Sequence, residues 1–330
     1  MKRLKAAIIG CGKIGSSYDN SLEDRYTYSH AKAYLLNPHI DLIAVCDKDT
    51  DKLEQFTLKW GSGIQCFENS DDLLARHCPD VLSICTPTPV HEKELLRALD
   101  TDIPFVLCEK PFIDDLDRAV EISNLYKYSE KTLIINHVLR WETGIQKIRE
   151  HLKQRTLGSV QTVSAVYAKG LVHNGIHIVD LTLHLFGEPT DILKLSEFTE
   201  VTDDPTCNFV FFYPGFQVVF LGLRELCYSI FEYTMFLEGG KIIITDLTNR
   251  ILISKAVSHP FLDGYRYLSP DPEAIPTHQY KNMALVINDI IKGIIENRPN
   301  LFRCTSEDAC RTLHYLKLIR EQECRNCYHC

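Results

Sequence analysis

Several segments of this chain combine residue types and spacing that could do chemistry. The first contains Gly10, Gly12, Lys13, Ile14 and Gly15 in a G-x-G-x-x-G run directly after an apolar segment. In such a run the first glycine allows a tight turn, the second lets a pyrophosphate approach the backbone, and the third lets a helix pack against the sheet. The helix that follows offers amide donors to phosphate. The run therefore predicts a dinucleotide site; an ordinary glycine turn is the alternative.

An acidic residue, Asp47, ends the next apolar run. A carboxylate at this place can accept hydrogen bonds from the adenosine ribose and repel a 2′-phosphate, which favours NAD. The neighbouring Lys48 keeps NADP open, and a loop aspartate without a ligand is the alternative for Asp47. Asp47 lies farther from Gly15 than the usual spacing of about 20 residues. We assign the excess to a polar insertion at residues 16–30.

The second segment is Glu109-Lys110-Pro111, which follows the apolar run 105–108. A residue after a buried parallel strand lies at the carboxyl edge of the sheet, where open α/β sheets bind ligands. The Lys110 ammonium could polarise a substrate oxygen there and hold developing alkoxide charge. Pro111 favours an extended backbone at Lys110 and makes a cis peptide bond between them plausible. A solvated surface lysine is the alternative.

Histidines gather on a predicted helix at residues 174–186 and just before it. His173, His177, Asp180 and His184 are spaced to share one helical face. His177 is the candidate proton carrier because its ordinary pKa lies near 6.5. A histidine that only packs on the helix is one alternative, and a metal site with two histidines and a carboxylate is another. We expect no metal there, and we interpret Asp180 as a residue that fixes the helix.

The tail also has the spacing of a metal site. Its C-x-x-C-x-x-C pattern contains Cys324, Cys327, His329 and Cys330. Three thiols and an imidazole could bind zinc. No second ligand cluster is evident in the sequence, so we expect a solvated tail.

The elements that must position these residues follow from hydrophobic periodicity. Up to about residue 136, short apolar runs alternate with amphipathic stretches, which is typical of βαβ units and a parallel sheet. Beyond residue 150, runs with alternating polarity predict an antiparallel sheet with one solvated face. The expected strands are 4–9, 42–46, 81–85, 105–108, 132–136, 159–167, 191–195, 207–212, 217–223, 228–237, 241–245 and 250–254. The expected helices are 51–60, 70–76, 91–99, 116–128, 174–186, 279–297 and 306–323.

The fold class that follows is α/β: an N-terminal Rossmann doubly wound parallel sheet at residues 1–136, then an α+β domain at 137–330 with an open, mostly antiparallel sheet. A chain of 330 residues exceeds the size at which single cores stop growing. The net charge of -8 argues against nucleic acid or an anionic membrane as partner. No export signal or long apolar window is evident, so we expect reduced cysteines and a cytoplasmic protein.

A series of motifs resembles the glucose–fructose oxidoreductase/inositol dehydrogenase/rhizopine catabolism family. The segment DVLSICTPTPVH at 80–91 resembles D-x-V-x-I-x-T-P-x-x-x-H, with Leu82 in the usual Val place. VLCEKP at 106–111 resembles the family's EKP motif. GIHIVD at 175–180, with LFG at 185–187, resembles G-x-H-x-x-D…L-x-G. The order and spacing of these blocks agree over nearly the whole chain.

The resemblance implies hydride exchange between nicotinamide and a secondary alcohol or carbonyl of a sugar, cyclitol or nucleotide sugar. It assigns catalysis to Lys110 and His177, which we expect to converge on one substrate oxygen. Members of the family differ over whether the lysine or the histidine is the formal acid/base; we expect His177, with Lys110 as its electrostatic partner. The expected cofactor residues are Gly10, Gly12, Lys13, Ile14, Gly15, Asp47, Thr86, Pro87, His91, Glu109 and Lys110. The expected substrate residues are Asn136, Arg140, Lys169, His173 and Asn174, with Tyr167 as a further pocket contact.

One departure from the family pattern puts the catalytic group in doubt. His173 stands where the family usually has an aspartate, four residues before the histidine. A non-catalytic, dinucleotide-binding regulator of the same fold is therefore the second hypothesis, and a metal-dependent lyase or hydrolase is the third. The resemblance also implies a homodimer or homotetramer formed through the C-terminal sheet.

Overall fold

The computed structural model describes residues 3–199, 204–224 and 228–323. The cysteine-rich tail, for which a solvated end was predicted, lies outside the described residues. The chain forms two compact units. The first comprises residues 1–141 and 280–311, and the second comprises residues 142–279 and 312–330. This grouping differs from the division at residue 136, because the segment 280–311 returns to pack within the first unit.

The first unit contains a six-stranded parallel sheet, which confirms the predicted Rossmann fold. Its strand order is β3-β2-β1-β4-β5-β6, the doubly wound order in which ligands bind at the reversal between β1 and β4. Most of these strands are buried along their length, as strands covered on both faces should be. The strands are β1 (Leu4–Ile9), β2 (Ile40–Cys46), β3 (Gln65–Phe67), β4 (Val81–Ile84), β5 (Phe105–Cys108) and β6 (Thr132–Ile135).

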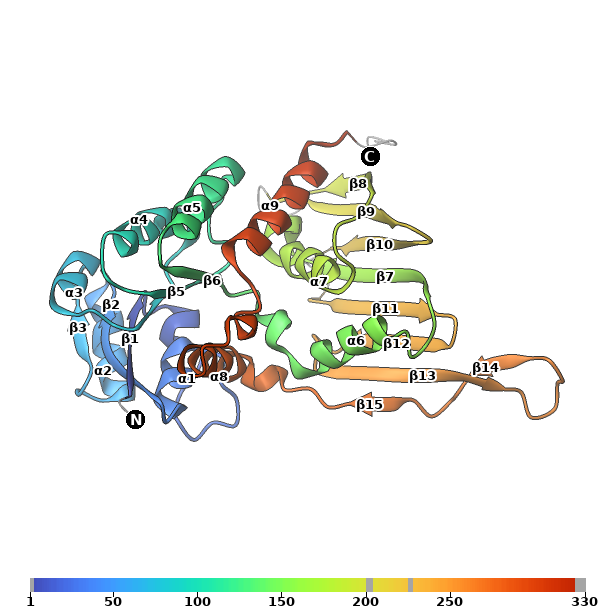
Figure 1. Cartoon of the computed structure of the whole chain (residues 1–330), viewed down its shortest axis with the longest axis horizontal. Helices are drawn as coiled ribbons and strands as arrows, with labels where there is room; N and C mark the ends of the chain where they lie inside the picture. Colours follow the sequence, from blue (N-terminus) through green and yellow to red (C-terminus); the bar gives the residue numbers. More distant parts are fainter. Residues whose placement is uncertain (1–2, 200–203, 225–227, 324–330) are drawn as a thin grey trace. The chain divides into compact units, whose positions relative to one another are not determined.

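Helices cover both faces of this sheet, with α4 and α5 on one face and α1 and α8 on the other (Figure 1). Several begin at a side-chain cap: Ser29, Asp49, Asn69 and Asp115 each accept a backbone N–H in the first turn. The helix α8 packs on α1, where Asn37 donates to Asn288 Oδ1 at 2.8 Å. The helices are α1 (His30–Leu36), α2 (Thr50–Trp60), α3 (Ser70–Arg76), α4 (Thr88–Leu99), α5 (Leu116–Tyr128) and α8 (Asn282–Ile295).

The predicted polar insertion interrupts the helix that normally follows the glycine motif. A single π-helical turn at Lys13–Ser17 comes first, and α1 begins only at His30. The buried Asp19 fixes the intervening loop by accepting hydrogen bonds from Tyr28 N at 3.1 Å and from Ser29 N at 2.7 Å. The insertion is therefore a structured loop anchored by a buried carboxylate.

The second unit contains a nine-stranded, mostly antiparallel sheet, as predicted. Its main path is β14-β13-β12-β11-β7-β10-β9-β8, and β15 pairs with β13. Among the described strands of this sheet, β7 and β10 alone pair in parallel, because the chain leaves β7 for a helix and two strands before β10 returns beside it. The strands are β7 (Val160–Ala168), β8 (Asp191–Phe198), β9 (Thr206–Tyr213), β10 (Phe216–Leu223), β11 (Phe231–Leu237), β12 (Gly240–Thr245), β13 (Arg250–Ser258), β14 (Arg266–Leu268) and β15 (Glu273–Ile275).

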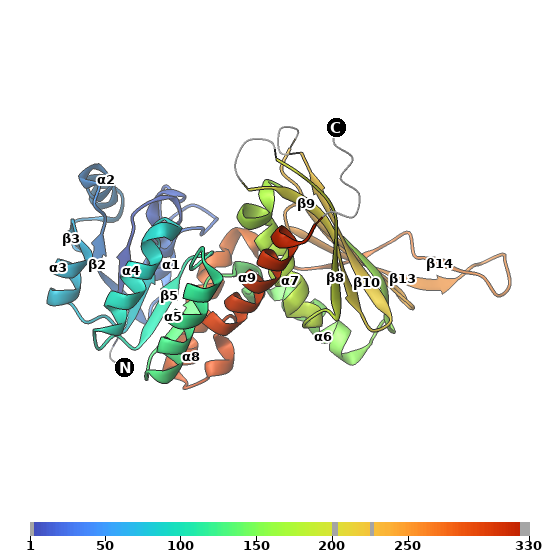
Figure 2. The same ribbon diagram turned by 90° about the horizontal axis from the view of Figure 1, so that it is seen from above.

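Helices α6 (Thr143–Gln154) and α7 (Ile176–Phe186) lie on one face of this sheet, which Figure 2 shows edge-on. The later residues of α9 (Ser306–Glu321) join them, with the rings of Tyr315 and Phe211 5.4 Å apart. Inward side chains such as Val163, Phe220 and Met235 are fully or almost fully buried. Among the described residues, no helix is long and apolar enough to cross a membrane.

Candidate functional site

A cavity of about 590 Å³ lies in the first unit around the glycine turn. Its size is within the range of small-molecule sites. It brings together the predicted cofactor residues Gly10, Gly12, Lys13, Ile14, Asp47, Thr86 and Pro87 with Tyr18, Lys48, Lys52, Glu68, Asn69, Ser70, Val90, Lys93, Glu94 and Arg97. These residues come from the ends of β1, β2 and β4 and from the helices that follow the strands, as in other open α/β sheets.

Each of the three glycines in the turn lies in a different steric environment. Gly10 has φ +103°, and a Cβ there would lie 2.7 Å from the backbone of Cys85 at the end of β4. A Cβ on Gly15 would lie 2.0 Å from the carbonyl oxygen of Gly10. A Cβ on Gly12 would meet nothing within 4 Å, so this residue faces open space at the cavity. A phosphate can therefore approach the backbone at Gly12.

Asp47 is held in place at the end of β2. Its Oδ2 accepts Cys11 N at 2.8 Å, and its Oδ1 accepts Asp49 N at 3.0 Å. These bonds fix the carboxylate beside the glycine turn while each oxygen keeps a second lone pair for a ribose hydroxyl. The Lys52 ammonium lies 3.9 Å from Oδ1, and Lys48 is exposed beside it.

Two buried polar atoms in the cavity lining support the fit of a dinucleotide. Within the described part of the chain, Thr86 Oγ1 and Glu94 Oε2 have no hydrogen-bond partner. Buried polar atoms without partners are uncommon, and a ligand is one way to satisfy them. Together with the open approach at Gly12, the residues present fit a bound dinucleotide.

His91 links the two loops that follow β4 and β5. Its ring is almost fully buried; Nε2 lies 2.6 Å from Thr86 O, and Nδ1 lies 3.1 Å from Pro111 O. Because backbone carbonyls contact both ring nitrogens, the arrangement favours a role for His91 in positioning these loops over a direct contact with the cofactor. The peptide bond between Lys110 and Pro111 is cis, as suspected from the sequence.

Glu109 is the centre of a buried hydrogen-bond network. His30 Nε2 lies 2.9 Å from Glu109 Oε1, and Asn136 Nδ2 donates to the same oxygen at 2.6 Å. Burial raises the pKa of this carboxyl, but His30, Asn136 and Lys110 outweigh it, so the pKa lies below its usual range. Burial lowers the pKa of Lys110, and the Glu109 charge opposes that effect. Glu109 therefore lies beside Lys110 as a carboxylate.

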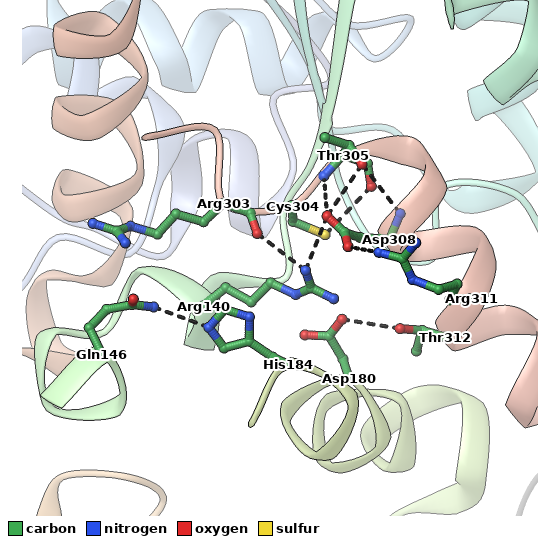
Figure 3. Close-up of polar contacts among 10 residues, drawn as sticks. All are labelled: Arg140, Gln146, Asp180, His184, Arg303, Cys304, Thr305, Asp308, Arg311 and Thr312. Atoms are coloured by element: carbon green, nitrogen blue, oxygen red, sulfur yellow. Dashed lines mark hydrogen bonds and ion pairs between the residues drawn. The ribbon is translucent and has the colours of Figure 1, made fainter. Parts of the chain in front are cut away.

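Arg140 has structural partners inside the first unit (Figure 3). Its Nη1 donates to Arg303 O at 3.2 Å and lies 3.2 Å from Asp308 Oδ2. Burial raises the Asp308 pKa, but Arg140, the Thr305 amide and Arg311 reverse this, so the pKa lies below its usual value. These contacts hold the start of α9, and a substrate contact for Arg140 stays a prediction.

In the second unit, the predicted substrate residues lie on a tight turn before α7. Lys169 has φ +72° and begins the π-helical turn Gly170–Gly175, which contains His173 and Asn174. Asp204 anchors this turn, because its Oδ2 accepts His173 N at 2.8 Å and its Oδ1 accepts Val172 N at 2.9 Å. His173 is exposed, and Lys169 and Asn174 are half-buried.

His177 is half-buried in the first turn of α7, which begins at Ile176. His173 belongs to the preceding π-helical turn, so the four predicted ligands do not share one continuous α-helical face. Farther along α7, Asp180 accepts Thr312 Oγ1 at 3.1 Å, and Gln146 Nε2 lies 3.2 Å from His184 Nε2 (Figure 3). These contacts fit the helix-fixing role predicted for Asp180.

Tyr167, suggested as a pocket contact, is fully buried, and its hydroxyl bonds both N and O of Cys207. It therefore connects β7 to β9. Sequence reasoning missed His30 and Glu94. In the sequence both resemble ordinary polar residues of a helix. The structure shows that His30 is buried beside Glu109 and that Glu94 is buried in the lining of the cavity.

Comparison with known proteins agrees with this geometry. Residues 4–137 match the family model described as an oxidoreductase family with an NAD-binding Rossmann fold. D-glucoside 3-dehydrogenase of Escherichia coli is 25% identical over 205 residues, covering 56% of this chain and 55% of that protein. Inositol 2-dehydrogenase 2 of Mycolicibacterium vanbaalenii is 26% identical over 200 residues, covering 57% and 55%. The chain thus spans about half the length of the curated relatives it matches.

Solved structures share the whole fold. UDP-N-acetylglucosamine 3-dehydrogenase from Acidithiobacillus ferrooxidans superposes with a TM-score of 0.75 at 22% identity, over 97% of each chain. An oxidoreductase from Agrobacterium radiobacter, in complex with NAD+, L-tartaric acid and magnesium, gives a TM-score of 0.72 at 16% identity. It covers 97% of this chain and 96% of that one. The matched NAD-binding Rossmann domain at residues 4–137 and these relatives agree with the resemblance to the glucose–fructose oxidoreductase/inositol dehydrogenase/rhizopine catabolism family.

Proposed function

We propose that this protein is an NAD-dependent oxidoreductase that transfers hydride between nicotinamide and a secondary alcohol or carbonyl of a sugar, cyclitol or nucleotide sugar. The observation that carries the proposal is the cavity around the glycine turn, with Asp47 fixed beside it. Relatives named for glucoside and inositol, and a structural neighbour named for UDP-N-acetylglucosamine, support a polyhydroxylated substrate.

Lys110 and His177 are the proposed catalytic residues. Nicotinamide, when bound, supplies the hydride acceptor. A lysine held beside Glu109 keeps a positive charge available, and that charge would stabilise the oxygen as the alcohol loses its proton. His177 would take that proton, since an imidazole can exchange protons near neutral pH.

The residues proposed for substrate binding are Asn136, Arg140, Lys169, His173 and Asn174. The support is strongest for Asn136, because its Oδ1 is buried without a partner among the described residues. The amide nitrogen of Asn136 is already engaged by Glu109. A substrate hydroxyl could donate to the remaining oxygen.

The test is a screen of sugars, cyclitols and nucleotide sugars with NAD+ or NADH, following the absorbance of the reduced cofactor. For the best substrate, we expect Lys110→Ala and His177→Ala each to lower kcat by about 100-fold or more while the NAD+ Kd changes little. Asp191→Asn, on the exposed start of β8, is the control. Unchanged turnover in both catalytic variants would refute the assignment.

A non-catalytic dinucleotide-binding regulator is the second candidate function. It is favoured by His173, which stands where the family usually has an aspartate. NAD+ binding by calorimetry without turnover on any substrate of the screen would support this candidate over the enzyme.

We further propose a cytoplasmic homodimer or homotetramer formed through the sheet of the second unit. The outward face of that sheet carries Leu221 on β10 and Phe236 on β11, each 40% exposed, and Val166 and Val219 lie beside Leu221. Exposed apolar side chains on a sheet face are suited to pairing with a second copy. Within the described residues, the cysteines are free thiols, which is consistent with a reducing compartment.

A further inference from the structure

A chain of buried hydrogen bonds leads from the core of the first unit to Glu109. Tyr34 OH lies 2.7 Å from Ser83 Oγ, and Ser83 Oγ lies 2.9 Å from His30 Nδ1. His30 Nε2 then lies 2.9 Å from Glu109 Oε1. Tyr34, Ser83 and His30 are all fully buried. The catalytic proposal uses none of these three residues.

One arrangement gives every donor in this series an acceptor within it. Tyr34 O–H donates to Ser83, Ser83 O–H donates to the bare Nδ1 of His30, and Nε2–H donates to Glu109. If Nδ1 also carried a proton, Ser83 Oγ could accept from both Nδ1 and Tyr34, because a hydroxyl oxygen has two lone pairs. The buried Ser83 proton would then have no acceptor within this network, which is unfavourable. The neutral Nε2–H form is therefore the one that satisfies the network.

We propose that His30 is a positioning residue: it holds the Glu109 carboxylate, in its ionised form, beside Lys110. Because His30 and Asn136 both donate to Oε1, they fix the orientation of the carboxylate. His30 acts through Glu109, and this inference rests on the catalytic role proposed for Lys110.

The first test measures Lys110 directly and needs no substrate. The probe is acetic anhydride, and peptide mass spectrometry compares the acetylation rate of Lys110 with that of the exposed Lys127. Replacing His30 by leucine removes the donor, so the buried carboxyl gains a proton more easily and its charge no longer opposes deprotonation of Lys110. We expect His30→Leu and Glu109→Gln each to accelerate Lys110 acetylation several-fold.

His30→Gln is the matched conservative variant, since its amide can still donate to Glu109. We expect this variant to stay within about two-fold of the wild-type rate. The double variant of His30→Leu with Glu109→Gln should match Glu109→Gln alone, because both changes act on the same carboxylate. Additive effects, or an unchanged Lys110 rate in His30→Leu and Glu109→Gln, would overturn the proposal. If His30→Leu does not fold, His30→Met replaces it, because methionine also lacks the donor to Glu109 and fills a similar volume.

The second test separates catalysis from folding. We expect His30→Leu to lower kcat by about 10-fold or more with little change in the NAD+ Kd, and His30→Gln to restore most of it. Ser123→Ala, which removes a buried hydrogen bond to Ser306 elsewhere in the unit, should leave kcat unchanged. An equal loss of kcat in His30→Gln and His30→Leu would overturn the proposal. A wild-type protein without turnover would refute the proposed function, and the acetylation result would still decide the role of His30.

The protonation of the two ring nitrogens of His30 can be measured directly by NMR. In protein labelled with ¹⁵N-histidine, the His30 signals, identified by their loss in His30→Gln, should show one protonated and one bare nitrogen. Two protonated nitrogens would contradict the neutral form and its matched hydrogen bonds.

Discussion

At the scale of single residues, the site depends on carboxylates held by neighbouring hydrogen bonds. Asp47 is held by two backbone amides, and Glu109 is held by an imidazole and an amide side chain. Fixing a carboxylate in this way lowers the reorganisation needed when a ligand binds. Removing the charge of one such carboxylate should therefore change which cofactor the cavity prefers.

Asp47→Asn should weaken the preference for NAD over NADP. The substitution keeps an oxygen for hydrogen bonds but removes the charge that repels a 2′-phosphate, and Lys48 and Lys52 lie nearby. We expect the ratio of NADP to NAD affinity to rise by about 10-fold. Fluorescence titration with NADH and NADPH measures it. Asp49→Asn, at the cap of α2, is the control, and equal ratios in both variants would show that Asp47 does not select the cofactor.

The sequence could reveal residues that belong to short motifs, because a glycine turn and an acidic strand end depend on local geometry. It could not reveal His30, since its partner Glu109 lies far along the chain and only the fold brings the two together. The same reason applies to Arg140. It follows β6 as expected, but it pairs with Asp308 near the start of α9, which is far along the chain.

At the scale of elements, long and strongly patterned segments were predicted well. The predicted helices 70–76 and 116–128 agree with α3 and α5, and the predicted strand 105–108 agrees with β5. The short strand β3 and the edge strands β14 and β15 were missed because three residues give no readable periodicity. The helix α6 was missed although its apolar face is buried against the sheet of the second unit.

The junction of Arg140 with the first turn of α9 should make stability depend on acid pH. The folded pKa of Asp308 is lowered, so the unfolded state binds the proton more readily. The stabilisation is therefore present above the ordinary value of 3.8 and is lost as the pH falls below it. Asp308→Asn should cost about 1–3 kcal/mol at pH 7 and flatten the pH dependence of unfolding below pH 4.

Urea denaturation from pH 2.5 to 7 measures this effect. Glu307→Gln is the control, since its carboxylate is exposed and pairs with Lys127 at the surface. Parallel pH curves for the wild type and Asp308→Asn would contradict the assignment.

At the scale of the whole molecule, the outward face of the second sheet is the interface that we propose for an oligomer. Leu221→Glu together with Phe236→Glu should place two charges in the proposed contact and convert the oligomer into monomers. Sedimentation or light scattering measures the mass. Leu58→Glu, on the 80%-exposed Leu58 of α2, is the control. A monomeric wild type, or an oligomer that survives both charges, would refute this interface.

The two units show that the order of elements along the sequence does not determine which unit an element belongs to. The predicted division assigned everything after residue 136 to one domain, because helices 279–297 and 306–323 follow the antiparallel strands directly. The structure instead returns residues 280–311 to the first unit, where Ile135 N donates to Cys304 O at 3.1 Å. Periodicity identifies a helix, but it does not say which core the helix completes.

That return has a consequence for how the protein is made. Synthesis runs from the N-terminus, so the Rossmann strands leave the ribosome long before α8, which covers α1. Until the last of these residues is translated, the apolar surface of α1 that receives α8 stays uncovered. The nucleotide-binding core of the nascent chain therefore stays incomplete while the whole second sheet is synthesised. A chaperone can bind the uncovered surface during that interval.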